Sequence, residues 1–182
     1  MSEIAERYRG LSEKFAAVVA AVPEARWADP SPCAEWQARD VVRHVIQAQG
    51  VFLGFVGRDA EGGPSVDDDP GASWDHARGV VQAELDDPER ADAPFEGFTG
   101  PTTFEAGVDR FLCTDLIVHR CDLAVATGQD TTLEPAEMTH VRSSMAGLED
   151  QLRSPGAIGP ELEPPPDADE QVRFLAWAGR RA

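Results

Sequence analysis

The sequence predicts an all-α protein, an up-and-down four-helix bundle with short extra helices and a hairpin or irregular excursion before its central helix. Apolar residues recur at steps of three and four in several long segments, which is the period of an α-helix. Pro and Gly residues separate these segments. The segment 107–128 is apolar on nearly all sides, which indicates a helix in the middle of a bundle. All 182 residues are expected to form a single domain, 1–182.

The N-terminal part of the chain is expected to supply the first two long helices. Residues 2–22 carry apolar side chains at helical spacing, and Pro23 closes the segment. The Pro-rich segment 23–36 contains two tryptophans and is expected to pack against the bundle. A second helix follows at about 37–56, with Asp40 near its N-terminus, where the helix dipole favours a carboxylate.

The middle of the chain is less regular. Residues 58–71 are acidic and rich in Gly and Pro, so we expect a mobile loop there. A weaker helical period covers about 72–85. Residues 93–105 alternate aromatic with small and turn-forming residues, which is compatible with either a short hairpin or an ordered loop before the central helix.

Two further helices are expected after the central one. The period of the apolar residues predicts a helix at 135–152, and 170–182 reads as a short amphipathic helix. The segment between them, 154–169, contains five prolines and is expected to be extended. The amphipathic helices at 2–22 and 135–152 could pack within one chain or across a homodimer, and the sequence leaves this open.

Charge and composition exclude several classes of partner. The chain has 33 acidic and 16 basic residues and a formal net charge of −17, which repels phosphate backbones and anionic membrane surfaces. We therefore expect a small-molecule substrate and neither nucleic acid nor a membrane as the partner. The N-terminus resembles no signal peptide, and no stretch approaches the roughly 18 apolar residues of a membrane span, so a cytoplasmic location is expected.

Ionisable side chains on the apolar faces of two helices predict a metal site. Asp115 and His119, four residues apart, lie on the same face of the central helix. His44 lies on the apolar face of the second helix. A lone histidine on such a face is more often a hydrogen-bonded core residue, but two imidazoles and a carboxylate that converge match a three-ligand metal site with open positions. His76 and His140 read as ordinary surface or cap residues.

Asp122 is expected close to this group, because it follows His119 by three residues on the same helix. A metal-bound imidazole usually donates its second N–H to an oxygen, so Asp122 could orient His119. A salt bridge between Asp122 and an arginine is an equally good reading.

Two motifs resemble those of a known family. PSPCAEWQARDVVRHV at 30–45 pairs a Pro-Cys-x-x-Trp run with a histidine, and TDLIVHRCDLAVATGQ at 114–129 is an acid-x3-His-x2-Asp helix. These motifs, with the lead-in AVPEARWADPSPC and the terminal LAWAGR, resemble the DinB-like bundle proteins related to the N-terminal domain of mycothiol-dependent maleylpyruvate isomerase. The resemblance covers nearly the whole chain.

The resemblance implies a fold, a metal and a chemistry. The fold is a four-helix bundle, and the family's metal ligands fall on His44, Asp115 and His119. The metal is a divalent ion, most simply Zn²⁺, with Ni²⁺, Fe²⁺ or Mn²⁺ as other candidates. Relatives use mycothiol or another low-molecular-weight thiol as cosubstrate, which implies a metal-dependent thiol S-transferase or isomerase acting on a small electrophilic substrate.

Two other functions remain open from the sequence. The chain could be a non-catalytic protein that binds or sequesters a metal or a small ligand. It could also hold these polar residues as an internally satisfied core cluster with no metal. The catalytic residues themselves are unknown at this point; only the three candidate metal ligands and Asp122, which could orient His119, are singled out.

Overall fold

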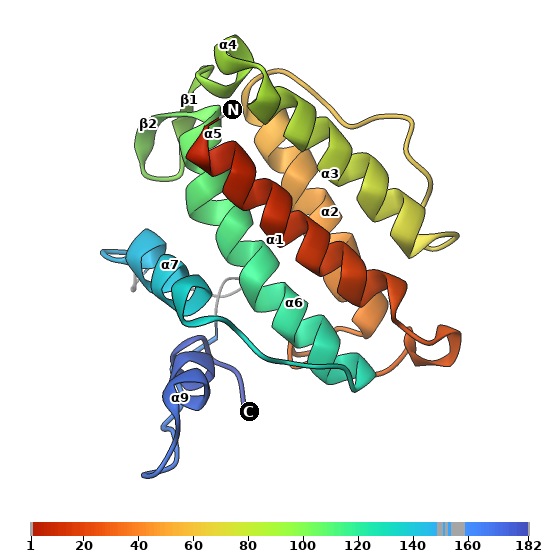
Figure 1. Ribbon diagram of the computed structural model, residues 1–182, viewed down its shortest axis with the longest axis vertical. Helices are drawn as coiled ribbons and strands as arrows, with labels where there is room; N and C mark the ends of the chain where they lie inside the picture. The colour runs from red at the N-terminus through yellow and green to blue at the C-terminus, as the bar shows by residue number, and fades with distance from the viewer. Residues whose placement is uncertain (1, 149–150, 152, 154–158, 182) are drawn as a thin grey trace.

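The computed structural model describes residues 2–148, 151, 153 and 159–181 and confirms the all-α bundle. Four long helices form it (Figure 1): α1 (Glu3–Ala20), α2 (Ala38–Phe55), α3 (Pro70–Asp86) and α6 (Cys113–Thr127). Helix α1 packs against α3 and α6, and α2 packs against the same two helices. Consecutive helices α1 and α2 therefore stand at opposite corners of the bundle.

The helix directions depart from strict alternation at one step. By the colours of Figure 1, α1 and α6 run toward the lower right, whereas α2 and α3 both run the opposite way. The connection 56–69 is therefore a crossover that returns along the bundle. Its 14 residues can reach about 46 Å, which exceeds the length of about 27 Å of the 18-residue helix α2.

This crossover, expected as a mobile loop, makes specific contacts with the bundle. Val66 is buried. The guanidinium of Arg39 on α2 donates to the carbonyl of Val66 over 3.3 Å, and Arg43 forms an ion pair of 2.7 Å with Asp67. The middle of the loop is thus held against α2.

The segment before the central helix forms a hairpin, one of the two structures that the sequence allowed. A short helix α4 (Pro88–Ala91) leads into strands β1 (Pro94–Gly97) and β2 (Gly100–Thr103), which pair antiparallel. Helix α5 (Phe104–Gly107) then continues through a π-helical turn, η2 (Val108–Leu112), into α6. The central helix is therefore longer than expected, and it contains one wide turn.

The ends of the later helices differ from expectation. Gly128, with a φ of +70°, ends α6 in the left-handed conformation that glycine adopts most easily. Helix α7 (Pro135–Met145) stops seven residues before the expected end at 152, because Ala146 leaves the helical conformation and Gly147 has a φ of +78°. Positions 149–150 and 152 of the expected helix, and part of the expected extended segment, lie outside the described residues. Helix α9 (Glu170–Trp177) follows as expected.

One hydrophobic cluster runs from Ala5 in α1 to Leu175 in α9. Within it, the hydroxyl of Tyr8 donates a hydrogen bond of 2.7 Å to the side-chain oxygen of Gln49, and both residues are fully buried. This bond joins α1 to α2 across the diagonal of the bundle. Among the described residues, no helix is both long and apolar enough to cross a membrane.

The Tyr8–Gln49 bond gives a first prediction. Tyr8→Phe should lower the free energy of unfolding by about 1–3 kcal/mol, because it leaves the Gln49 oxygen buried without a donor. Replacing both partners, as Tyr8→Phe with Gln49→Leu, should recover much of that loss. Urea unfolding of the wild type, both single variants and the double variant measures this, and additive losses in the double variant would contradict it.

Candidate metal centre

The bundle brings His44, Asp115 and His119 together. His44 comes from α2, and the other two residues lie one turn apart on α6. Asp115 Oδ2 is 3.4 Å from His44 Nε2, and Asp115 Oδ1 is 3.9 Å from His119 Nε2. One potential ligand atom from each of the three lies within 4.8 Å of the others. The two imidazole rings meet edge to face with their centroids 4.8 Å apart.

The spacing of these atoms fits one small ion. Two donors bound at about 2.1 Å to a tetrahedral Zn²⁺ lie about 3.4 Å apart. Each imidazole therefore lies close to this spacing from one oxygen of Asp115, His44 at 3.4 Å from Oδ2 and His119 at 3.9 Å from Oδ1. Two imidazoles and a carboxylate are also a donor set that zinc and its neighbours accept.

The centre is closed on one side and open on the other. The side chain of His119 is only 8% exposed, whereas those of His44 and Asp115 are 36% and 33% exposed. Small molecules from solvent can therefore reach His44 and Asp115.

Asp122 fills both roles that the sequence left open. Its Oδ2 lies 2.9 Å from His119 Nδ1, so that when this nitrogen carries the proton His119 donates it to Asp122 and keeps Nε2 for the centre. The same carboxylate accepts hydrogen bonds of 3.2 and 3.0 Å from Arg180 near the end of the chain. The buried Asp122 is thus both ion-paired to an arginine and bonded to the histidine.

Neighbouring charges set the ionisation of both carboxylates. Burial alone would raise the pKa of Asp122, but the hydrogen bond from His119 and the charges of His119 and Arg180 more than offset it, so the pKa lies well below its ordinary value. Burial likewise opposes ionisation of Asp115, yet the hydrogen bond from His44 and the charges of both histidines lower its pKa. Both groups are carboxylates at neutral pH.

A compact loop after α1 covers one side of the centre. The Trp36 amide donates to the Cys33 carbonyl over 3.1 Å, and Glu35 inside this turn has a φ of +67°, a conformation that favours glycine. The turn places the indole of Trp36 against both imidazoles, 4.9 Å from His44 and 6.0 Å from His119 between centroids.

The same turn brings Cys33 to Asp122. The thiol of Cys33 donates to Asp122 over 3.3 Å, and burial together with the Asp122 charge raises its pKa to about 12. Cys33, His119 and Asp122 therefore form a second group with possible metal-ligand atoms. Arg180 already neutralises Asp122 and contacts the Cys33 sulfur at 3.4 Å, so the group with His44 and Asp115 suits a cation better.

The remaining two histidines lie apart from this cluster. His76 Nε2 is 3.1 Å from the carbonyl of Ala60, and His140 Nε2 is 3.0 Å from that of Asp109. Sequence reasoning did not single out Arg180 or Trp36 as neighbours of the centre, although both fall in motifs that carried the family resemblance. Helical periodicity could not predict the contact between Asp122 and Arg180, because these residues are 58 positions apart in the chain.

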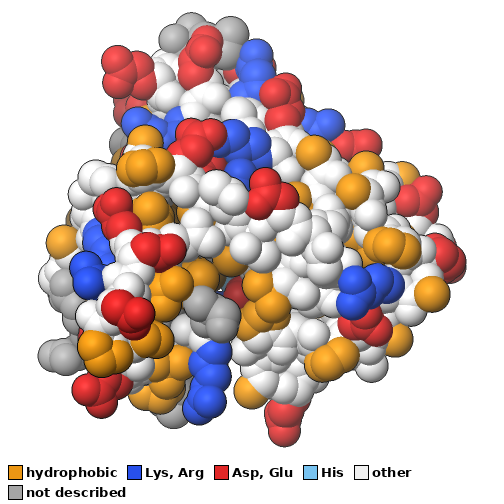
Figure 2. Space-filling model, turned by 60° about the horizontal axis from the view of Figure 1, so that its bottom comes forward, with side chains coloured by type: hydrophobic (Ala, Val, Ile, Leu, Met, Phe, Trp, Pro, Cys, Tyr) orange, Lys and Arg blue, Asp and Glu red, His pale blue; other side chains and the backbone are white. Residues whose placement is uncertain are grey.

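Charged side chains are mixed over the surface. On the face shown in Figure 2, acidic and basic residues alternate with apolar ones, and no single basic patch stands out. On this face, the acidic side chains are therefore scattered and not gathered at one place.

Comparison with known proteins gives one family. The model of the mycothiol maleylpyruvate isomerase N-terminal domain matches residues 8–124, a range that contains His44, Asp115, His119 and Asp122. Two uncharacterised proteins of Mycobacterium tuberculosis, from strains CDC 1551 / Oshkosh and ATCC 25618 / H37Rv, are each 29% identical over 168 residues, which is 90% of this chain and 91% of theirs. No solved structure matches the chain significantly.

The Asp122 network predicts a pH-dependent stability. Asp122→Asn should lower the free energy of unfolding of the metal-free protein by about 3–5 kcal/mol at pH 7, because Arg180 stays buried without its counter-ion. The folded-state pKa of Asp122 is lowered, so its contribution is complete above about pH 4 and is lost as the pH falls further.

Urea unfolding of the two proteins at pH 7, 5 and 3 measures this. The difference between them should be smaller at pH 3 than at pH 5. Asp75→Asn, which removes an exposed carboxylate paired with Arg78, is the control and should change stability by no more than about 0.5 kcal/mol. A difference that is constant down to pH 3 would contradict the assignment.

Proposed function

Because the chain belongs to the mycothiol maleylpyruvate isomerase N-terminal domain family, we propose that it is a metal-dependent thiol S-transferase or isomerase. Its metal is a divalent ion held by His44, Asp115 and His119, Zn²⁺ in the first place and Ni²⁺, Fe²⁺ or Mn²⁺ otherwise. Its cosubstrate is mycothiol or another low-molecular-weight thiol, and its substrate is a small electrophile. The convergence of three ligand atoms within 4.8 Å in a solvent-accessible position carries the proposal.

The side chains around the candidate metal centre have different proposed roles. Asp122 accepts the Nδ1 proton of His119 and thereby keeps Nε2 free as a donor atom. Arg180 fixes the Asp122 carboxylate from the other side, so the imidazole is held in one orientation. Trp36 covers both rings and keeps water from that side. The partly exposed His44 and Asp115 leave a side open for thiol and electrophile.

A bound divalent ion would supply Lewis-acid stabilisation of a thiolate, the nucleophilic form of a thiol, near neutral pH. The chain's own cysteines do not supply that nucleophile. Cys113 and Cys121 are buried, as expected of core residues, and Cys33 has a pKa of about 12. A thiol cosubstrate from solution accounts for this combination best.

Metal content is the first test. The purified untagged wild type should carry about one equivalent of divalent metal by elemental analysis. Asp115→Ala and His119→Ala should lose it, because each removes one of three ligands. His76→Ala, which alters a histidine bonded only to a loop carbonyl, is the matched control and should keep it. Wild-type protein that stays free of metal after reconstitution with zinc would overturn the proposal in favour of a satisfied polar cluster.

Thiol turnover is the second test. The zinc-loaded wild type should consume mycothiol in the presence of small electrophiles faster than zinc alone. His119→Ala should fall to the uncatalysed rate, and Asp122→Asn should lose roughly 10–100-fold, because it no longer orients the imidazole. His76→Ala should match the wild type. Full metal content without turnover across a panel of thiols and electrophiles would favour the non-catalytic, metal-sequestering alternative.

A further inference from the structure

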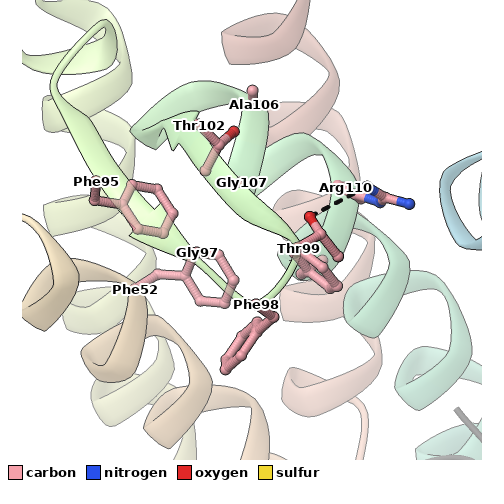
Figure 3. A pocket seen from close by; sticks show the side chains of 10 residues that line it. Phe52, Phe95, Gly97, Phe98, Thr99, Thr102, Ala106, Gly107 and Arg110 are labelled. Carbon is pink, nitrogen blue, oxygen red and sulfur yellow. Dashed lines mark hydrogen bonds between the residues drawn. The ribbon is translucent and has the colours of Figure 1, made fainter. Parts of the chain in front are cut away.

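A small aromatic cavity lies at the other end of the contact between α2 and α6. Figure 3 shows the side chains that line this cavity, and its volume is about 170 Å³. Phe52 of α2, Phe95 and Phe98 of the hairpin, and Phe111 of the π-helical turn supply most of its apolar wall. Gly107 forms part of the wall as bare backbone, since a Cβ there would lie 2.9 Å from Phe95 Cζ and 3.1 Å from Phe52 Cε1.

Phe98 at the hairpin tip is ordered by other rings yet remains open to solvent. Its ring meets Phe55 and Phe111 edge to face, with centroids 5.3 and 5.5 Å apart. Nevertheless, 67% of the residue is exposed. Phe98 therefore lies at the boundary between the cavity and solvent.

The cavity and the candidate metal centre lie along the same pair of helices. His44 faces His119 across α2 and α6, with ring centroids 4.8 Å apart, and Phe52 faces Phe111 at 5.9 Å. Phe52 follows His44 by eight residues and Phe111 precedes His119 by eight, so the two pairs are about 12 Å apart along the helices. In the chain, Asp115 lies midway between Phe111 and His119, four residues from each.

We propose that this cavity binds a single, unfused aromatic ring without a positive charge, and that the ring is part of the electrophilic substrate. The second half of this statement rests on the proposed function, whereas the first does not. Phe111 and Asp115 are four residues apart, which is about one helical turn or roughly 6 Å along the helix axis. The reactive atom would then be a short substituent away from the metal centre.

The size and chemistry of the cavity favour one ring. An apolar cavity of about 150 Å³ holds benzene, and the volume here is about 170 Å³. Aromatic rings prefer edge-to-face or offset contacts with one another, which the surrounding phenylalanines offer from several directions. Arg110 is the one charged lining residue, and its guanidinium already donates to the Ser144 carbonyl over 2.8 Å and to Thr99 over 3.4 Å. Both acceptors are uncharged, so the Arg110 cation remains at the wall and disfavours a positively charged ring.

Fluorine NMR titration with 4-fluorobenzyl alcohol tests the proposal. This neutral probe is a poor metal ligand, so it should bind the metal-free wild type and His119→Ala equally well. Ala106→Leu places a larger side chain in the cavity from an exposed helical position and should weaken binding roughly tenfold or more while metal content stays unchanged. Ala83→Leu, the same change at an exposed helical alanine of α3, should leave both unchanged.

Cyclohexylmethanol, of similar size but without an aromatic ring, should bind more weakly by roughly 2- to 10-fold in competition with the probe. The proposal is overturned if the probe fails to bind the wild type, if Ala106→Leu binds it as tightly as the wild type does, or if cyclohexylmethanol competes equally. Loss of metal binding in His119→Ala with the probe still bound separates the two sites. The experiment therefore distinguishes failure of the cavity proposal from failure of the metal-site proposal.

Discussion

The buried Asp122 carboxylate is the constraint on which the candidate centre depends. It is 1% exposed and receives hydrogen bonds from His119 on its own helix, Arg180 near the C-terminus and Cys33 in the loop after α1. A buried carboxylate without such partners would be costly. The bonds from Arg180 and Cys33 therefore tie distant parts of the chain to α6, and together with the bond from His119 they fix the orientation of the imidazole beside Asp115.

Much of the architecture could be predicted from the sequence, because helical periodicity is a local signal. The four bundle helices, the stop at Gly128 and the convergence of His44 with Asp115 and His119 all followed from spacing and from the family motifs. The parallel course of α2 and α3 could not be predicted, since a 14-residue loop is long enough for either direction. The early end of α7 at Met145 reflects backbone conformations at Ala146 and Gly147. The apolar residues beyond them continue the helical spacing, so the sequence pattern did not reveal this end.

The interface of α2 and α6 combines two chemically different ends. One end has polar, partly exposed groups that suit a cation, and the other has phenylalanine rings around a cavity. Ala48, which lies four residues from both His44 and Phe52 on α2, is small and half-buried, so it leaves little bulk between the two ends. The residues of the family motifs lie at the polar end, so family membership supports a role for that end. The aromatic end draws on the hairpin, a part of the chain that those motifs do not include.

The π-helical turn at Val108–Leu112 lies where these two ends meet. Such a turn contains one residue more than an α-helix would need, and that extra residue rotates whatever precedes it by about 100° about the helix axis. Loss of one residue here during evolution would leave α6 and its histidine unchanged while swinging the hairpin and its rings to a new side. The turn thus offers a route by which relatives could diverge in the molecules they accept while retaining the same candidate metal ligands.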